Sequence, residues 1–125
     1  MIKVEGLTKR YARNVAVDNI SFEVEKGQIV GFLGPNGAGK STMMKILTCY
    51  IPPTEGGATV CGFDVNSQSL DVRRQIGYLP EHNPLYLDMY VKEFLKFAGG
   101  LYRISDISSR VAKMIEITGL GPEQN

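Results

Sequence analysis

One stretch of the sequence combines residue types and spacing that can hold phosphate groups. Residues 31–42 read GFLGPNGAGKST, and Gly34 to Ser41 match the pattern G-x-x-x-x-G-K-[ST]. Glycines let the backbone adopt conformations closed to other residues, so that several N–H groups can point at one anion. A helix beginning near Lys40 would aim its free N–H groups and its partial positive charge at the same point. The sequence therefore predicts a phosphate-binding loop, the P-loop.

The side chains at the end of this loop suit a nucleotide that carries a divalent cation. Lys40 would place its charge on the β- and γ-phosphates, and the Ser41 hydroxyl would bind Mg²⁺. A glycine-rich turn that happens to precede a lysine is the plain alternative. The motif, however, lies between an apolar run and a helical pattern, which is the context that phosphate binding requires. The residues expected to bind the nucleotide are Gly34, Pro35, Asn36, Gly37, Ala38, Gly39, Lys40, Ser41 and Thr42.

The segments around the loop alternate between strand and helix patterns. Residues 2–4 and 19–24 alternate apolar with polar side chains, as half-exposed strands do. Residues 28–34 form a short apolar run bounded by glycines, which predicts a strand buried on both faces of a parallel sheet. Residues 41–50 have one apolar side and precede Pro52, so we expect a helix that ends there.

The later part of the chain changes from strand patterns to helix patterns. We expect a strand at residues 58–65 that is broken at Gly62, a short helix at 70–75, a buried strand at 76–79, and helices at 91–101 and 107–117. Together the patterns predict an α/β fold, with strands before residue 91 and only helices after it.

Length and composition set mild limits on function. The 125 residues suffice for one modest domain, and 43% hydrophobic and 22% charged residues are ordinary for a globular protein. A net charge of +1 gives no reason to expect nucleic acid as a partner. No apolar run could span a bilayer, and the N-terminus lacks a signal-peptide core, so we expect a soluble, cytosolic chain. Cys49 and Cys61 have no His or Cys partners at metal spacing, so we expect two buried, reduced thiols.

The motif and its flanks resemble the N-terminal half of an ATP-binding cassette (ABC) domain, the motor subunit of ABC transporters. GPNGAGKST, preceded by YARNVAVDNISFEVEKGQIVGFL, carries the resemblance, which covers essentially the whole chain. It implies ATP and Mg²⁺ as ligands and an incomplete P-loop (ABC ATPase) fold, with an antiparallel hairpin and part of a parallel core sheet. Residues 1–90 would form the P-loop subdomain, and residues 91–125 would begin the helical subdomain before its signature motif.

The resemblance also implies a site for the adenine ring. An aromatic residue of the first hairpin stacks on adenine in this family, and Tyr11 holds the matching position, with Val17 as a second contact. Stacking on a ring face suits a purine. A tyrosine at the end of a strand can also be an ordinary surface aromatic, and this alternative stays open.

A second expected site residue departs from the usual family pattern. The family usually ends the segment matching residues 76–81 with a Gln whose oxygen reaches Mg²⁺ and the attacking water, whereas this chain has Glu81. A carboxylate remains a good oxygen ligand for Mg²⁺. In having a Glu at this position, the chain resembles the ATPases of ABC-2-type exporters, among them the motors associated with gliding motility. The alternative is a solvated loop acid.

The loop from His82 to Tyr90 carries several apolar residues where solvent exposure is expected. By resemblance it would contact the coupling helix of a membrane-spanning permease. The alternative is packing against the helices that follow. Arg73 and Arg74 are expected only on a solvated or salt-bridged face.

Three family features of hydrolysis do not occur in these 125 residues: a signature loop resembling LSGGQ, an apolar strand ending in Asp-Glu, and a switch histidine. We therefore expect no catalytic residue in this chain, and an ability to bind nucleotide with little or no hydrolysis. The chain would be a fragment of a longer ATPase, or else a short regulatory nucleotide-binding module. A fragment would be marginally stable or would self-associate.

The resemblance implies a transport motor whose two ATPase subunits, identical or different, sandwich ATP on the cytoplasmic face of the membrane. Their closure would drive the permease, and the branch resemblance points to an exporter. The alternative is a soluble ABC-type ATPase without a membrane partner, like the relatives that act on ribosomes or DNA. The near-neutral charge disfavours nucleic acid, and the apolar loop favours a protein partner.

Overall fold

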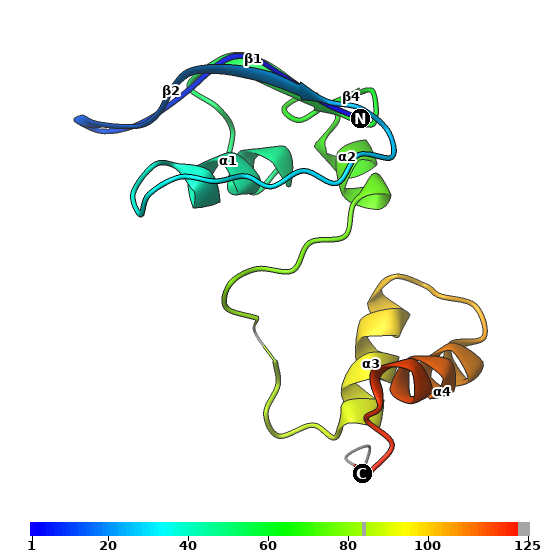
Figure 1. Cartoon of the computed structure of the whole chain (residues 1–125). Helices are drawn as coiled ribbons and strands as arrows, with labels where there is room; N and C mark the ends of the chain where they lie inside the picture. Colours follow the sequence, from blue (N-terminus) through cyan, green and yellow to red (C-terminus); the bar gives the residue numbers. More distant parts are fainter. Residues whose placement is uncertain (84, 123–125) are drawn as a thin grey trace. The chain divides into compact units, whose positions relative to one another are not determined.

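The computed structural model describes residues 1–83 and 85–122 and divides into two units, Met1–Tyr78 and Leu79–Asn125 (Figure 1). Each unit is described by itself. The first unit contains β1 (Ile2–Tyr11), β2 (Asn14–Val24), α1 (Lys40–Leu47), β3 (Glu55–Val60), β4 (Phe63–Asp64) and α2 (Ser69–Gln75). The second contains α3 (Val91–Leu101) and α4 (Ile107–Thr118). The predicted helices are thus confirmed, while the predicted subdomain boundary at residue 90 stays a prediction.

The four strands form one antiparallel sheet in the order β2-β1-β3-β4. The segment expected as one strand broken at Gly62 is a hairpin, in which Val60 pairs with Phe63. Cys61 (φ 52°) and Gly62 (φ 84°) form its two-residue turn, and positive φ at both positions is what the twist of a tight hairpin favours. Because Cys61 occupies this turn it is exposed, so the prediction of two buried cysteines holds only for Cys49.

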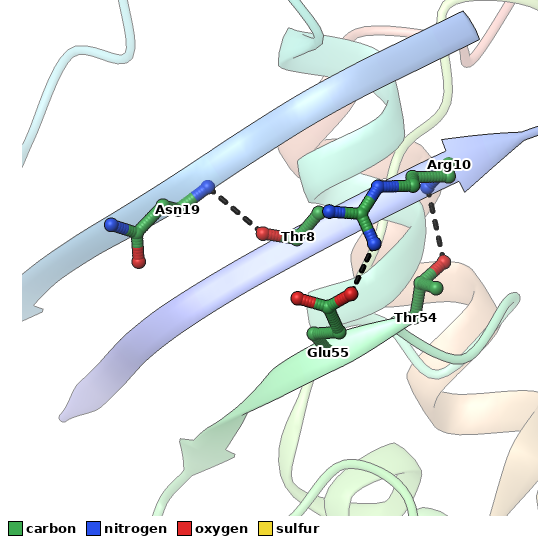
Figure 2. A network of polar contacts seen from close by, with 5 residues as sticks. All are labelled: Thr8, Arg10, Asn19, Thr54 and Glu55. Atoms are coloured by element: carbon green, nitrogen blue, oxygen red, sulfur yellow. Dashed lines mark hydrogen bonds and ion pairs between the residues drawn. The ribbon is translucent and has the colours of Figure 1, made fainter. Parts of the chain in front are cut away.

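A polar network ties the three longest strands together where their pairing shifts register (Figure 2). The Asn19 N–H of β2 donates to the hydroxyl of buried Thr8 on β1, at 3.0 Å. The Arg10 N–H donates to the Thr54 hydroxyl at 3.0 Å, and the Arg10 guanidinium pairs with the Glu55 carboxylate. The network stabilises the end of the sheet at which Tyr11 lies.

α1 and α2 lie on one face of this sheet (Figure 1) and complete a small apolar core. The fully buried side chains are those of Leu7, Met43, Ile46, Val4 and Val72. Each side chain of this size contributes about 1.5–3 kcal/mol when it leaves water. This core fixes the side of α1 that faces the sheet and leaves its N-terminal end free for other contacts.

The buried strand expected in a parallel sheet at residues 28–34 and the buried strand expected at residues 76–79 do not form. Neither segment pairs with a strand among the residues that the structure describes, and a strand without a neighbour has no ladder of hydrogen bonds to hold it. The side chains of Ile29 and Leu33 are 103% and 93% exposed, although Phe32 packs on Phe22 with 5.7 Å between ring centroids. The apolar run is correctly recognised, but its burial was wrongly predicted.

The second unit is a helical hairpin. The Tyr90 N–H donates to the Glu93 carboxylate at 3.2 Å at the start of α3, and Gly119 (φ 71°) ends α4. Buried Gly99 lets the helices approach, because a Cβ there would lie 2.8 Å from Cδ1 of Ile107. None of the helices in the described parts of the chain has the length and apolar character needed to cross a membrane.

Candidate nucleotide-binding site

The glycines of the P-loop are needed where the loop turns into α1. Gly37 and Gly39 have φ of 84° and 85°, in the left-handed region that glycine tolerates best. A Cβ on Gly39 would lie 2.2 Å from the Ala16 carbonyl oxygen and 3.0 Å from Cγ2 of Val17. The missing side chain therefore lets the loop rest directly on β2 and sets the place where α1 begins.

The N-terminal end of α1 is equipped to bind an anion. Gly39 precedes the helix without a side-chain cap, and the first turn carries no acidic residue. The first N–H groups of a helix have no partner within the helix, and the aligned peptide dipoles leave partial positive charge there. Ser41 is exposed at this end, as a cation ligand must be. These features fit a phosphate group with an attached Mg²⁺.

The Lys40 ammonium lies on the loop itself. It donates hydrogen bonds to the Pro35 carbonyl at 2.8 Å and to the Gly34 carbonyl. The Ala38 N–H donates to the Pro35 carbonyl at 3.2 Å and closes the turn. The positive charge is thereby held within the loop, at the Pro35 carbonyl that also accepts from the Ala38 N–H.

A cavity of about 500 Å³ joins the P-loop to β2. The structure thus brings five predicted residues together: Val17, Gly37, Ala38, Gly39 and Lys40. Val17 is buried and packs against Gly39, so in this arrangement it supports the loop. Its contact with adenine stays a prediction.

Tyr11 does not line this cavity. It lies at the end of β1 with 46% of its surface exposed. The Lys9 ammonium lies 5.4 Å from the ring centroid, within the range of a cation–π contact, and donates to the Pro52 carbonyl at 2.6 Å. The cation lies over the ring, and the role of Tyr11 in stacking on adenine stays a prediction.

Glu81 and the loop of residues 82–90 belong to the second unit, whereas Ser41 belongs to the first. Glu81 is exposed, and its role as an Mg²⁺ ligand stays a prediction. Pro84 lies outside the described residues. Tyr86 packs on α3, with centroid distances of 6.3 Å to Phe94 and 5.7 Å to Phe97, whereas Leu87 is 90% exposed. Both expectations for the loop, packing and an exposed apolar surface, therefore find support in different side chains.

The two arginines of α2 differ. Arg74 forms the expected ion pair with Asp71 at 3.1 Å, inside its own helix. The Arg73 guanidinium instead donates to the Cys49 carbonyl, just beyond the C-terminal end of α1. This contact could not be predicted from local patterns, because it joins residues 24 positions apart whose approach depends on the whole unit.

Cys49 has a thiol whose pKa is raised above its ordinary value. Burial is the main cause, and the nearby Asp64 carboxylate adds to it, while the Arg73 charge works in the opposite direction. The thiol therefore stays protonated near neutral pH. Among the described residues no cluster of three or more His, Cys, Asp or Glu side chains could hold a metal ion.

The chain is similar in sequence to ATP-binding proteins of ABC transporters. The chain is 41% identical over 125 residues to the uncharacterized ABC transporter ATP-binding protein YxlF of Bacillus subtilis (strain 168), with 96% of this chain and 40% of YxlF covered. It is 34% identical over 122 residues to the Nod factor export ATP-binding protein I of Cupriavidus metallidurans, again with 96% and 40% covered. The chain thus spans less than half the length of these relatives.

The fold comparison points the same way. The solved structure of an ATP-binding subunit of an ABC transporter matches with a TM-score of 0.84 and 27% identity, over 99% of this chain and 52% of that one. The predicted incomplete ABC ATPase fold is therefore confirmed. The family model described as ABC transporter matches residues 17–125. The chain therefore belongs to the ABC transporter family.

Proposed function

We propose that this chain binds MgATP as the N-terminal part of the ATP-binding motor subunit of an ABC transporter. The observation that carries the proposal is the N-terminal end of α1, which has no acidic residue or side-chain cap and follows a loop held open by Gly39. Backbone N–H groups and the α1 dipole act there, the Lys40 charge lies on the same loop, and together they favour a phosphate chain over a neutral ligand.

Each residue of the site has a role in this proposal. The Lys40 ammonium exchanges its carbonyl partners Gly34 and Pro35 for β- and γ-phosphate oxygens. Ser41 supplies its hydroxyl to Mg²⁺, and Glu81 supplies a carboxylate. The partly exposed Tyr11 ring stacks on adenine. Bound Mg²⁺ would neutralise charge on the phosphates.

Hydrolysis belongs, in our proposal, to a longer protein. Phosphoryl transfer requires a group that positions the attacking water, and the family's Asp-Glu pair and switch histidine do not occur in this sequence. The chain alone is expected to hold ATP with little turnover, while the longer protein is an ATPase that works as a dimer.

The longer protein, we propose, drives a membrane-spanning permease from the cytoplasmic face, most simply as an exporter. Leu87, 90% exposed in the loop that follows Glu81, supports a protein partner there. Export is supported by the resemblance of Glu81 to the ABC-2 branch. Co-purification of the longer protein with a multi-span membrane protein tests this. Purification alone or with ribosomes would favour the soluble ATPase.

The binding proposal is tested by calorimetric titration with MgATP, since the chain has no Trp for intrinsic fluorescence. Lys40→Ala is expected to weaken binding by about tenfold or more, as the loss of a charge-assisted contact does. Lys45→Ala, at the other end of α1, serves as the matched control and should bind normally. Equal affinity of Lys40→Ala and the unchanged chain would contradict the site.

The stacking role of Tyr11 needs a second ligand. Tyr11→Ala should weaken MgATP binding by about tenfold, while leaving inorganic tripolyphosphate binding unchanged, because only ATP carries a base to stack. A variant that binds ATP as well as the unchanged chain would remove Tyr11 from the site.

A further inference from the structure

α1 has a different partner at each end. Its N-terminal end begins at Gly39, against the Ala16 carbonyl of β2. Beyond its C-terminal end, the Cys49 carbonyl accepts a hydrogen bond from Arg73 of α2. With eight residues the helix is about 12 Å long, so a shift at one end reaches the other end undiminished.

The turn that Arg73 contacts has little freedom of its own. Cys49 is buried and has φ 59°, a conformation that side-chain-bearing residues adopt rarely. The Tyr50 N–H closes the turn on the Lys45 carbonyl at 2.7 Å. A guanidinium at this place also complements the negative end of the α1 dipole. The contact is therefore a fixed cationic anchor for the end of the helix.

The core and the two ends of α1 restrain the helix in different ways. Met43, Ile46 and Leu47 are buried and fix which side of the helix faces the sheet. Apolar contacts of this kind are non-directional, so they do not by themselves fix the hydrogen-bonding geometry at either end of the helix. Directional contacts at the two ends add that restraint. Arg73 supplies it at the C-terminal end.

We propose that Arg73 is a positioning residue for phosphate binding, which holds α1 along its axis through the Cys49 carbonyl so that its N-terminal N–H groups meet the phosphates. The inference rests on the proposed nucleotide-binding function and adds a determinant outside the P-loop. Arg74, the next residue, pairs with Asp71 within α2 and makes no such contact, so it offers a matched control.

The experiment compares Arg73→Ala, Arg73→Lys and Arg74→Ala in titrations with MgATP and with magnesium tripolyphosphate. Arg73→Ala should raise the Kd for both ligands by about three- to tenfold, because the anchor acts on the phosphate end of the site. Arg74→Ala should leave both Kd values unchanged. Arg73→Lys should recover part of the affinity, since it keeps a positive donor near the carbonyl.

A merely stabilising role is separated from positioning by two further readouts. Val65→Ala, in the core but outside α1, should lower the melting temperature while leaving the Kd unchanged where the protein is folded. Amide NMR shifts of Gly39, Lys40 and Ser41 should move in Arg73→Ala without ligand and stay in place in Arg74→Ala. Unmoved amides, or equal Kd values for Arg73→Ala and Arg74→Ala, would overturn the inference.

The two proposals fail in different ways. If the unchanged chain does not bind MgATP in a Lys40-dependent manner, the proposed function fails. The ligand-free amide shifts still decide whether Arg73 positions the start of α1.

Discussion

At the scale of single residues, Gly39 carries the most specific demand of the site. Replacing it by Ala would place a Cβ 2.2 Å from the Ala16 carbonyl oxygen, at a φ of 85°. Gly37 has nearly the same φ, 84°, but a Cβ there would meet nothing within 4 Å. The pair therefore separates the cost of backbone strain from the cost of a steric clash.

We expect Gly39→Ala to destabilise the first unit by about 2–4 kcal/mol and to abolish measurable MgATP binding, because the loop must leave β2. Gly37→Ala should cost about 1 kcal/mol, the strain term alone. Thermal unfolding followed by circular dichroism measures both. Equal losses in the two variants would show that the close approach to Ala16 is unimportant.

Asp64 gives a prediction that depends on pH. Its carboxylate accepts hydrogen bonds from the Ser67 N–H and hydroxyl, both at 2.8 Å, and from the Asn66 N–H at 3.0 Å. These bonds, those from Ser67 first, hold the pKa of Asp64 below its ordinary value, against a smaller opposing effect of burial. The charged form is therefore favoured in the folded state.

A lowered pKa means that Asp64 contributes stability above its unfolded pKa of about 3.9, and that this contribution disappears as the pH falls through the folded pKa. Ser67→Ala should raise the pKa of Asp64 in an NMR carboxyl titration. It should also make the free energy of unfolding differ less between pH 6 and acidic pH than it does in the unchanged chain. Ser109→Ala, at an exposed position of α4, is the control. An unchanged Asp64 titration in Ser67→Ala would contradict the assignment.

At the scale of elements, α3 offers two adjacent glycines in opposite surroundings. A Cβ at Gly99 would lie 2.8 Å from Cδ1 and 3.0 Å from Cγ1 of Ile107, whereas a Cβ at Gly100 would meet nothing within 4 Å. Alanine stabilises a helix by about 1 kcal/mol relative to glycine when its Cβ clashes with no neighbouring atom. The neighbour therefore decides the sign of the effect.

Gly100→Ala should stabilise the helical hairpin by about 0.5–1 kcal/mol. Gly99→Ala should gain nothing or lose about 1–2 kcal/mol, because Ile107 must move and the helices must separate slightly. Urea unfolding monitored by helical circular dichroism compares them. A gain in both variants would mean that α3 and α4 are not closely packed at Gly99.

Elements with local signals could be predicted from the sequence. The P-loop pattern located the start of α1, and the apolar spacing located α3 within its observed bounds. The strand expected at residues 28–34 could not be judged in this way, because an apolar run reports a tendency to be buried and not the presence of a pairing neighbour. The Arg73 contact was hidden for a related reason, since it depends on how α2 packs beneath the sheet.

At the scale of the whole molecule, we expect the exposed apolar run at residues 29–33 to cause association between chains. Ile29 and Leu33 are 103% and 93% exposed, and an apolar run of this kind favours contact between chains. We expect sedimentation velocity to show association that increases with protein concentration. Ile29→Lys should reduce it, because a charge in the contact must be desolvated.

Leu70 supplies the control for that experiment. It is also exposed, at 65%, but belongs to α2 and not to the run. Leu70→Lys should leave the association unchanged. Sedimentation as a monomer at all concentrations, or an equal effect of both lysines, would refute the role of residues 29–33.

The two thiols have unequal surroundings, so the rates at which they are labelled report how often the core opens. Cys61 lies on the exposed hairpin turn and can react with a maleimide dye at once, whereas Cys49 is 8% exposed and belongs to the core. The first label therefore marks an edge of the sheet away from the P-loop. The second label can attach only when the core opens. Its rate of attachment therefore measures the rate of opening, in a protein without tryptophan.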